Sequence, residues 1–147
     1  MPEVPFHYVD LRAFRYATED EKRVEEALRR FLPEEFPVER QESEGYHGDR
    51  ILVLSARVEN ADDLRTVFSA VADLDDIERV IDQLDDRVDE NCSLFMRLDK
   101  QAAFRGDVAL GEGITLRGKV EAYPANKEAA VENAREFLRE YLGGDAG

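Results

Sequence analysis

The sequence contains one cysteine, Cys92, and two histidines, His7 and His47, in 147 residues. A single cysteine excludes an internal disulfide framework and a cysteine-rich zinc site. The histidines have no Cys or His partner at ligand spacing, so we expect no metal. The longest aliphatic run, residues 51–54, is far shorter than the ~18 residues that span a bilayer, and residues 1–16 lack the apolar stretch of a signal peptide. We therefore expect a cytoplasmic protein without membrane contact or small-molecule cofactor.

Lysine is also scarce. The 20 basic residues include only four lysines, whereas Asp and Glu total 34 and the formal net charge is -14. An acidic, arginine-rich surface is typical of adaptation to molar salt, where screening over ~3 Å removes carboxylate repulsion. Because 43% of the residues are hydrophobic, intrinsic disorder is not expected. The length predicts one domain over residues 1–147, and the acidic, lysine-poor composition predicts a halophilic protein.

Alternation of apolar and polar residues predicts five strands, at residues 6–16, 37–42, 51–59, 92–99 and 114–123. Apolar residues at helical spacing predict four helices. The first follows a Thr18–Glu21 capping box, the second an Asn60 cap, the third starts near Asp75, and the last covers 126–142 and is closed by Gly143–Gly144. The stretch from 100 to 106 shows the least regular pattern.

The resulting order is β-α-β-β-α-α-β-β-α. It favours an α+β fold in which an open mixed or mainly antiparallel sheet carries helices packed on one face. The aliphatic residues of the strands must meet the helices, which leaves the opposite sets together on the other face. These sets combine aromatic, basic and acidic residues: Phe6, Tyr8, Phe14, Tyr16, Phe95 and Tyr123; Arg12, Arg57, Arg97, Arg117 and Lys119; and Asp10, Glu59, Asp99 and Glu121.

Aromatic rings on a sheet accept stacked bases at roughly 1–3 kcal/mol each, and arginine pairs with phosphate or stacks on a base. The uncovered face is therefore a candidate RNA platform. Two other readings stay open. The same residues could serve cross-strand pairing alone, or the face could be buried in a homodimer and act as a protein-interaction module.

Signals for an enzyme are weak. Two acidic clusters could hold Mg²⁺, although such runs are more typical of solvated helix ends; they are Asp85–Asp86 with Asp89–Glu90, and Asp73 with Asp75–Asp76. Cys92 has no histidine nearby to activate it, so it reads as a small core residue. No glycine-rich loop with a following lysine is present to cradle phosphate. We expect a protein that is not an enzyme.

Three segments carry a resemblance to a known family: HYVDLRAFRYATEDEKRVEEAL, EGYHGDRILVLSARVEN and DRVDENCSLFMRLDKQAAFRG. They resemble an archaeal family of RNA-binding proteins, also described as exosome-subunit-like. The resemblance implies an α+β fold similar to that of the ribosomal protein that binds the small RNA of the large subunit. It also implies RNA as a partner, with exosome or ribosome-related proteins as further partners, and it brings no catalytic residues.

The matching segments supply candidate RNA contacts. Around EGYHGD they are Tyr46, His47 and Arg50, and around RLDKQAAFRG they are Arg97, Lys100, Gln101 and Arg105. Two of these have a simpler reading, since His47 could be a solvent-facing turn residue and Lys100 could pair locally with Asp99. The uncovered face adds further candidates: Phe95, Arg12, Tyr8, Arg117 and Lys119.

Overall fold

A computed structural model describes residues 4–15, 19–44 and 50–146 of the chain. Its centre is a five-stranded sheet in the order β2-β3-β1-β5-β4. Every neighbouring pair is antiparallel, so the predicted α+β class with an open antiparallel sheet is confirmed. The strands are β1 (Phe6–Arg15), β2 (Glu39–Glu44), β3 (Arg50–Val58), β4 (Ser93–Asp99) and β5 (Gly113–Val120).

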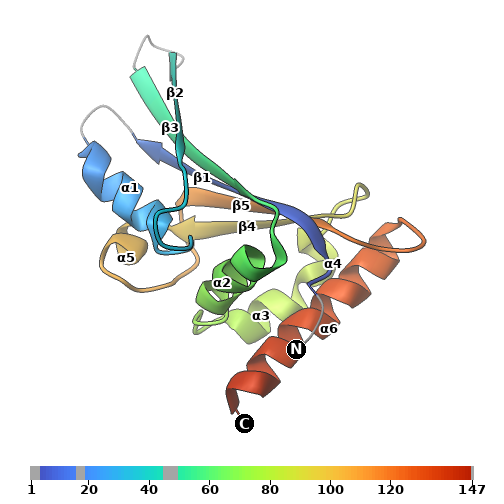
Figure 1. Cartoon of the computed structure of the whole chain (residues 1–147). Helices are drawn as coiled ribbons and strands as arrows, with labels where there is room; N and C mark the ends of the chain where they lie inside the picture. The colour runs from blue at the N-terminus through green and yellow to red at the C-terminus, as the bar shows by residue number, and fades with distance from the viewer. Residues whose placement is uncertain (1–3, 16–18, 45–49, 147) are drawn as a thin grey trace.

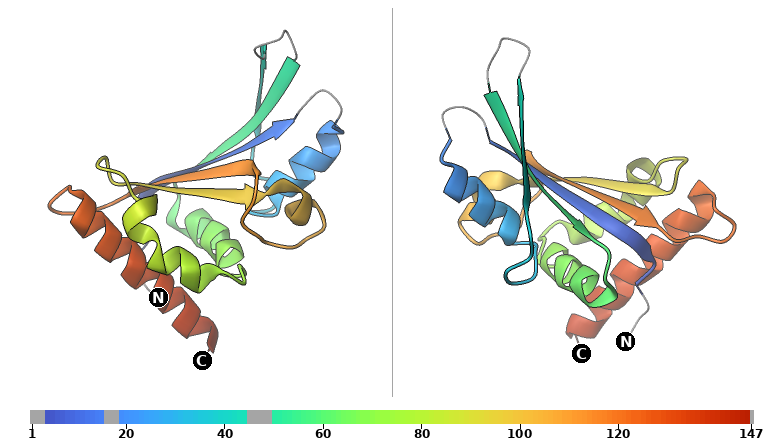
Figure 2. Two further views of the ribbon diagram at one scale, coloured as in Figure 1. Left: turned by 180° about the vertical axis from the view of Figure 1, so that it is seen from behind. Right: turned by 45° about the horizontal axis from the view of Figure 1, so that its top comes forward.

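The helices lie on one face of this sheet, as the two views in Figure 2 show. They are α1 (Glu21–Arg29), α2 (Ala61–Val71), α3 (Ile77–Asp82), α4 (Leu84–Arg87), α5 (Lys100–Phe104) and α6 (Lys127–Ala146). In Figure 1, α1 and α5 lie together under one end of β1 and β4, while α2, α3 and α6 cover the rest. Within the described residues, the opposite face of the sheet carries no helix.

Buried and less buried residues alternate along each strand, which explains why the helices cover one face of the sheet. Leu11 on β1, Leu54 on β3 and Leu116 on β5 are fully buried against the helices, whereas their neighbours along each strand point the other way. Helix α2 presents Leu64 and Phe68 to the same core. Its predicted cap is confirmed, because the Asn60 side chain accepts hydrogen bonds from the backbone of the first helical turn.

Several predicted boundaries were wrong. Helix α1 is capped by Asp20, whose carboxylate accepts the Lys22 N–H, rather than by a Thr18 capping box; Thr18 lies outside the described residues. The helix expected from Asp75 is divided, because Gln83 leaves the helical conformation between α3 and α4. Helix α6 continues through Gly143–Gly144 to Ala146.

The stretch expected to be irregular forms helix α5. The Asp99 carboxylate accepts the Ala102 N–H at 2.9 Å, which caps this single turn. Five residues are too few to display a helical period, so the pattern gave no signal. Strand β5 ends at Val120 rather than continuing to Tyr123, and β2 starts at Glu39 rather than at Pro37.

Phe6 is on the opposite side of the sheet from the one predicted. The pairing of β1 with β5 shifts register between Phe6 and Tyr8, and this irregularity turns Phe6 toward the helices. Phe6 is 3% exposed, and the centroid of its ring lies 4.6 Å from the centroid of the Phe68 ring. Gly118 makes room for it, because a Cβ there would stand 2.9 Å from the Phe6 ring.

Candidate functional site

The register of the sheet arranges the uncovered face in rows that run across the strands. In one row Asp10 of β1 lies opposite Arg57 of β3 and Arg117 of β5. In the next row Thr115 of β5 lies between Arg12 of β1 and Arg97 of β4. With strands about 4.8 Å apart, the Cα atoms of Arg12 and Arg97 are roughly 10 Å apart. Residues distant in the chain thus form one compact basic group.

On the β3 side of this face the charges neutralise one another. Arg57 donates two hydrogen bonds to the Asp10 carboxylate, at 2.8 and 3.0 Å, and its guanidinium lies 4.2 Å from the centre of the Tyr8 ring. The hydrogen bond to Asp10 raises the pKa of Arg57. Tyr8, Asp10 and Arg57 therefore interact with one another, and the fork-shaped guanidinium of Arg57 already has the Asp10 carboxylate as its hydrogen-bond acceptor.

On the β5 and β4 side the arginines have no such partner. No carboxylate within the described residues forms an ion pair with Arg12, Arg97 or Arg117. The acid that sequence alternation places nearest to Arg97, Asp99, uses its carboxylate to cap α5. Three guanidinium groups with free donors therefore share one half of the face in a chain with net charge -14.

Aromatic rings accompany these arginines. The Arg117 guanidinium lies 5.6 Å from the centre of the Phe95 ring. Phe95 is 44% exposed, although large apolar side chains are normally covered. These groups surround a shallow hollow of about 480 Å³, which is lined by Asp10, Arg12, Phe14, Phe95, Met96, Arg97, Thr115, Leu116 and Arg117. An apolar floor ringed by unpaired guanidiniums can stack a base and bind phosphate.

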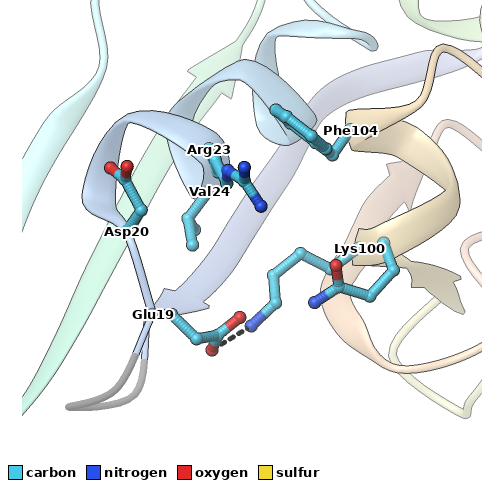
Figure 3. Close-up of a pocket in the computed structure, with 7 residues that line it drawn as sticks. Glu19, Asp20, Arg23, Val24, Lys100 and Phe104 are labelled. Atoms are coloured by element: carbon cyan, nitrogen blue, oxygen red, sulfur yellow. Dashed lines mark hydrogen bonds and ion pairs between the residues drawn. The ribbon is translucent and has the colours of Figure 1, made fainter.

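Lys100 is not on this surface. Only 7% of the residue is exposed, and its ammonium donates to the carbonyl oxygen of Phe14 at 2.7 Å and to the Glu19 carboxylate at 2.5 Å. Figure 3 shows Lys100 reaching across from α5 to Glu19, next to Arg23 and Phe104. The alternative reading, a local ion pair with Asp99, is not found either, and the Asp99 carboxylate caps α5 instead. Lys100 thus links β1, α1 and α5. We no longer count it among the candidate RNA contacts.

The other candidates from the matching segments are dispersed. Gln101 and Arg105 are exposed at the two ends of α5, on the helical side of the molecule. Arg50 is the first residue of β3, and Tyr46 and His47 lie outside the described residues. Lys119 is partly buried and donates to the backbone carbonyl of Asn91.

The acidic clusters do not assemble into a metal site. Within the described residues, no group of three or more His, Cys, Asp or Glu side chains could hold a metal ion. Asp73 pairs with Arg30 at 3.1 Å, and Asp85 lies 3.7 Å from Arg135. Cys92 is buried in the core. In that same part of the chain, no helix is long and apolar enough to cross a membrane.

We call the surface formed by Arg12, Phe95, Arg97 and Arg117 the arginine-rich surface. Sequence reasoning missed two residues that lie in it or beside it. Thr115 lies at the centre of the row between Arg12 and Arg97, and its position in the alternation of β5 could have revealed it. Arg87, at the end of α4, lines a second hollow beside Phe95 and Arg97. No sequence signal indicated Arg87, because it follows two aspartates and reads as part of a solvated helix end.

Most of the chain matches a family of known proteins. Residues 8–120, which include the uncovered face from Tyr8 to Lys119, match a family described as RNA binding. The chain belongs to this RNA-binding family. It is 36% identical over 143 residues to the RNA-binding protein PAB1135 of Pyrococcus abyssi, covering 90% of this chain and 93% of that protein. The resemblance to an archaeal family of RNA-binding proteins is thereby confirmed, and the exosome-subunit-like description stays a prediction.

Solved structures agree with this membership in the RNA-binding family. A DUF54 protein from Methanothermobacter thermautotrophicus superposes with a TM-score of 0.79 at 43% identity, over 90% of this chain and 98% of that one. A protein from Archaeoglobus fulgidus, also assigned to DUF54, gives a TM-score of 0.80 at 28% identity, over 89% and 98% of the two chains. The α+β fold is therefore shared with archaeal relatives.

Proposed function

We propose that this chain is a non-catalytic RNA-binding protein that holds RNA on the uncovered face of its sheet. One observation carries the proposal: three unpaired guanidiniums, on Arg12, Arg97 and Arg117, surround a hollow that contains the exposed ring of Phe95. Membership in the RNA-binding family supports RNA as the ligand.

Binding at this face rests on short-range contacts. A net charge of -14 opposes long-range attraction to a polyanion, and molar salt screens what remains. Stacking on Phe95 supplies about 1–3 kcal/mol, and each charge-assisted hydrogen bond to phosphate contributes on a similar scale. The neutralised pair of Asp10 and Arg57 marks the border of this surface toward β3.

The test measures the dissociation constant of a fluorescently labelled, random-sequence RNA pool at molar KCl. Single substitutions to Gln at Arg12, Arg97 and Arg117 are each expected to weaken binding by about 1–3 kcal/mol. Arg139→Gln is the matched control, because it removes the same charge from an exposed position on α6. It is expected to bind RNA like the unmodified protein.

Unchanged RNA affinity in all three variants, with intact melting curves, would contradict the proposed site. Loss of a dimer in the same variants, with no RNA bound by any form of the protein, would instead favour the interaction-module reading. Sedimentation equilibrium measured beside the binding curves separates these two outcomes.

A place in archaeal RNA processing, with the exosome as a partner, is the further part of this proposal, and it rests on the sequence resemblance. Crosslinking in cells at native salt, followed by sequencing of the bound RNA and identification of co-purified proteins, tests it. Recovery of RNA without exosome subunits would retain RNA binding and remove the exosome.

A further inference from the structure

The arginine-rich surface continues over the outer edge of β4. Phe95, Met96 and Arg97 line both the hollow on the uncovered face and a second hollow of about 400 Å³. The remaining lining residues of this second hollow are Asp86, Arg87, Leu110 and Gly111. Because α4 lies on the helical side of the sheet, a chain that follows the two hollows passes from the open face around its edge.

Arg87 lines this second hollow, and one of its hydrogen-bond donors has no partner. Its Nη2 atom donates to the Gln83 side-chain oxygen at 2.9 Å, but its Nε atom is buried without a hydrogen-bond partner. No described carboxylate forms an ion pair with it. Burial lowers the pKa of Arg87, and the neighbouring charge of Arg79 lowers it further. A partly buried cation without a counter-ion costs free energy that a bound anion would recover.

We propose that Arg87 and Arg97 form a phosphate subsite, which receives the backbone of single-stranded RNA as it leaves the uncovered face over the edge of β4. This inference rests on the proposed function. Phe95 lies between the two hollows, so a base stacked on its ring places the next phosphate toward Arg87. A base stacks on the face of the Phe95 ring when it is unpaired, and a single strand bends around the edge of β4 more readily than a stiff duplex, which favours single strands.

Asp86 weakens phosphate binding at this subsite. Its side chain is exposed and lines the same hollow, so its negative charge opposes phosphate there. Removing that charge should strengthen binding. Opposite effects of substitutions at two neighbouring positions, 86 and 87, distinguish a phosphate subsite from a general disturbance of α4.

The experiment measures binding of a labelled single-stranded RNA pool from about 0.5 to about 2 M KCl. Arg87→Gln is expected to weaken binding about tenfold and to reduce the slope of log affinity against log salt by about 0.7, the value for one lost phosphate contact on a single strand. Arg87→Lys should retain most of the slope. Asp86→Asn should bind more tightly, and Arg139→Gln should match the unmodified protein.

The outcomes separate this inference from the proposed function. If Arg97→Gln weakens binding while Arg87→Gln leaves affinity and slope unchanged, the strand stays on the open face and the subsite is wrong. If neither variant changes the affinity, the subsite is wrong, and if Arg12→Gln and Arg117→Gln also leave the affinity unchanged, the proposed face itself is wrong. Equal affinity for duplex RNA of the same pool would overturn the single-strand assignment, and a melting curve of each variant confirms that it is folded.

Discussion

At the scale of single residues, Lys100 shows how burial changes the meaning of a basic side chain. Its ammonium is held between the Phe14 carbonyl and the Glu19 carboxylate, which join β1 and α1 to α5. Removing one partner of a buried ion pair leaves the other uncompensated. Lys100 therefore contributes to stability, and the arginines of the open face are left for ligand contacts.

Lys100→Ala is expected to lower the free energy of unfolding by about 3 kcal/mol. Urea denaturation at molar KCl measures this change in the free energy of unfolding. Lys22→Ala is the control, because Lys22 is exposed on α1 and its loss should change stability by less than about 0.5 kcal/mol. Equal stability of the two variants would show that the buried ion pair does not hold α5 to α1.

Phe95→Ala is expected to weaken RNA binding by about 1–3 kcal/mol without loss of stability, because the ring is 44% exposed and available for stacking. Tyr123→Ala provides the comparison. Tyr123 is 86% exposed but lies beyond the end of β5, so its removal should leave affinity unchanged. A larger effect at Tyr123 than at Phe95 would place the stacking surface elsewhere.

At the scale of elements, the irregular pairing of β1 with β5 determines how the sheet contacts α2 and α6. It turns Phe6 inward to meet Phe68 and Phe137, whose ring centroids lie 4.6 and 6.0 Å from that of Phe6. Gly118 on β5 leaves the space that this ring occupies. The register shift therefore sets the side of the sheet on which the Phe6 ring lies, and Gly118 leaves the room in which this ring packs.

Gly118→Ala is expected to destabilise the protein by about 1–3 kcal/mol, because its Cβ would stand 2.9 Å from the buried ring of Phe6. Thermal melting at fixed salt measures the change. Thr115→Ala, on the same strand but on the open face, should cost much less. A Gly118→Ala variant as stable as Thr115→Ala would mean that the Phe6 ring can move aside.

At the scale of the whole molecule, the net charge of -14 governs the dependence on salt. Lowering KCl lengthens the screening distance to about 10 Å at 0.1 M, so carboxylates on the surface repel one another. The melting temperature is expected to fall on dialysis from molar KCl to about 0.1 M. An unchanged melting temperature would contradict this explanation of the acidic composition.

Local patterns predicted most of the elements but not all their ends. Alternation along β3 correctly placed Leu52, Leu54, Ala56 and Val58 on the buried side. The α5 turn was missed because its cap by Asp99 is a single hydrogen bond, invisible to periodicity. Phe6 was misplaced because a register shift depends on the partner strand, here β5.

The sequence by itself determined the two unlike faces of each strand, since side chains alternate with period two and apolar sets must be buried. It also placed Phe95, Arg12, Arg97 and Arg117 on the face away from the helices. Tertiary structure alone decided which charges remain free. Asp10 neutralises Arg57 across strands, and Glu19 holds Lys100 in the interior. Ion pairs depend on distance in space, and strand order brings together residues that chain spacing keeps apart.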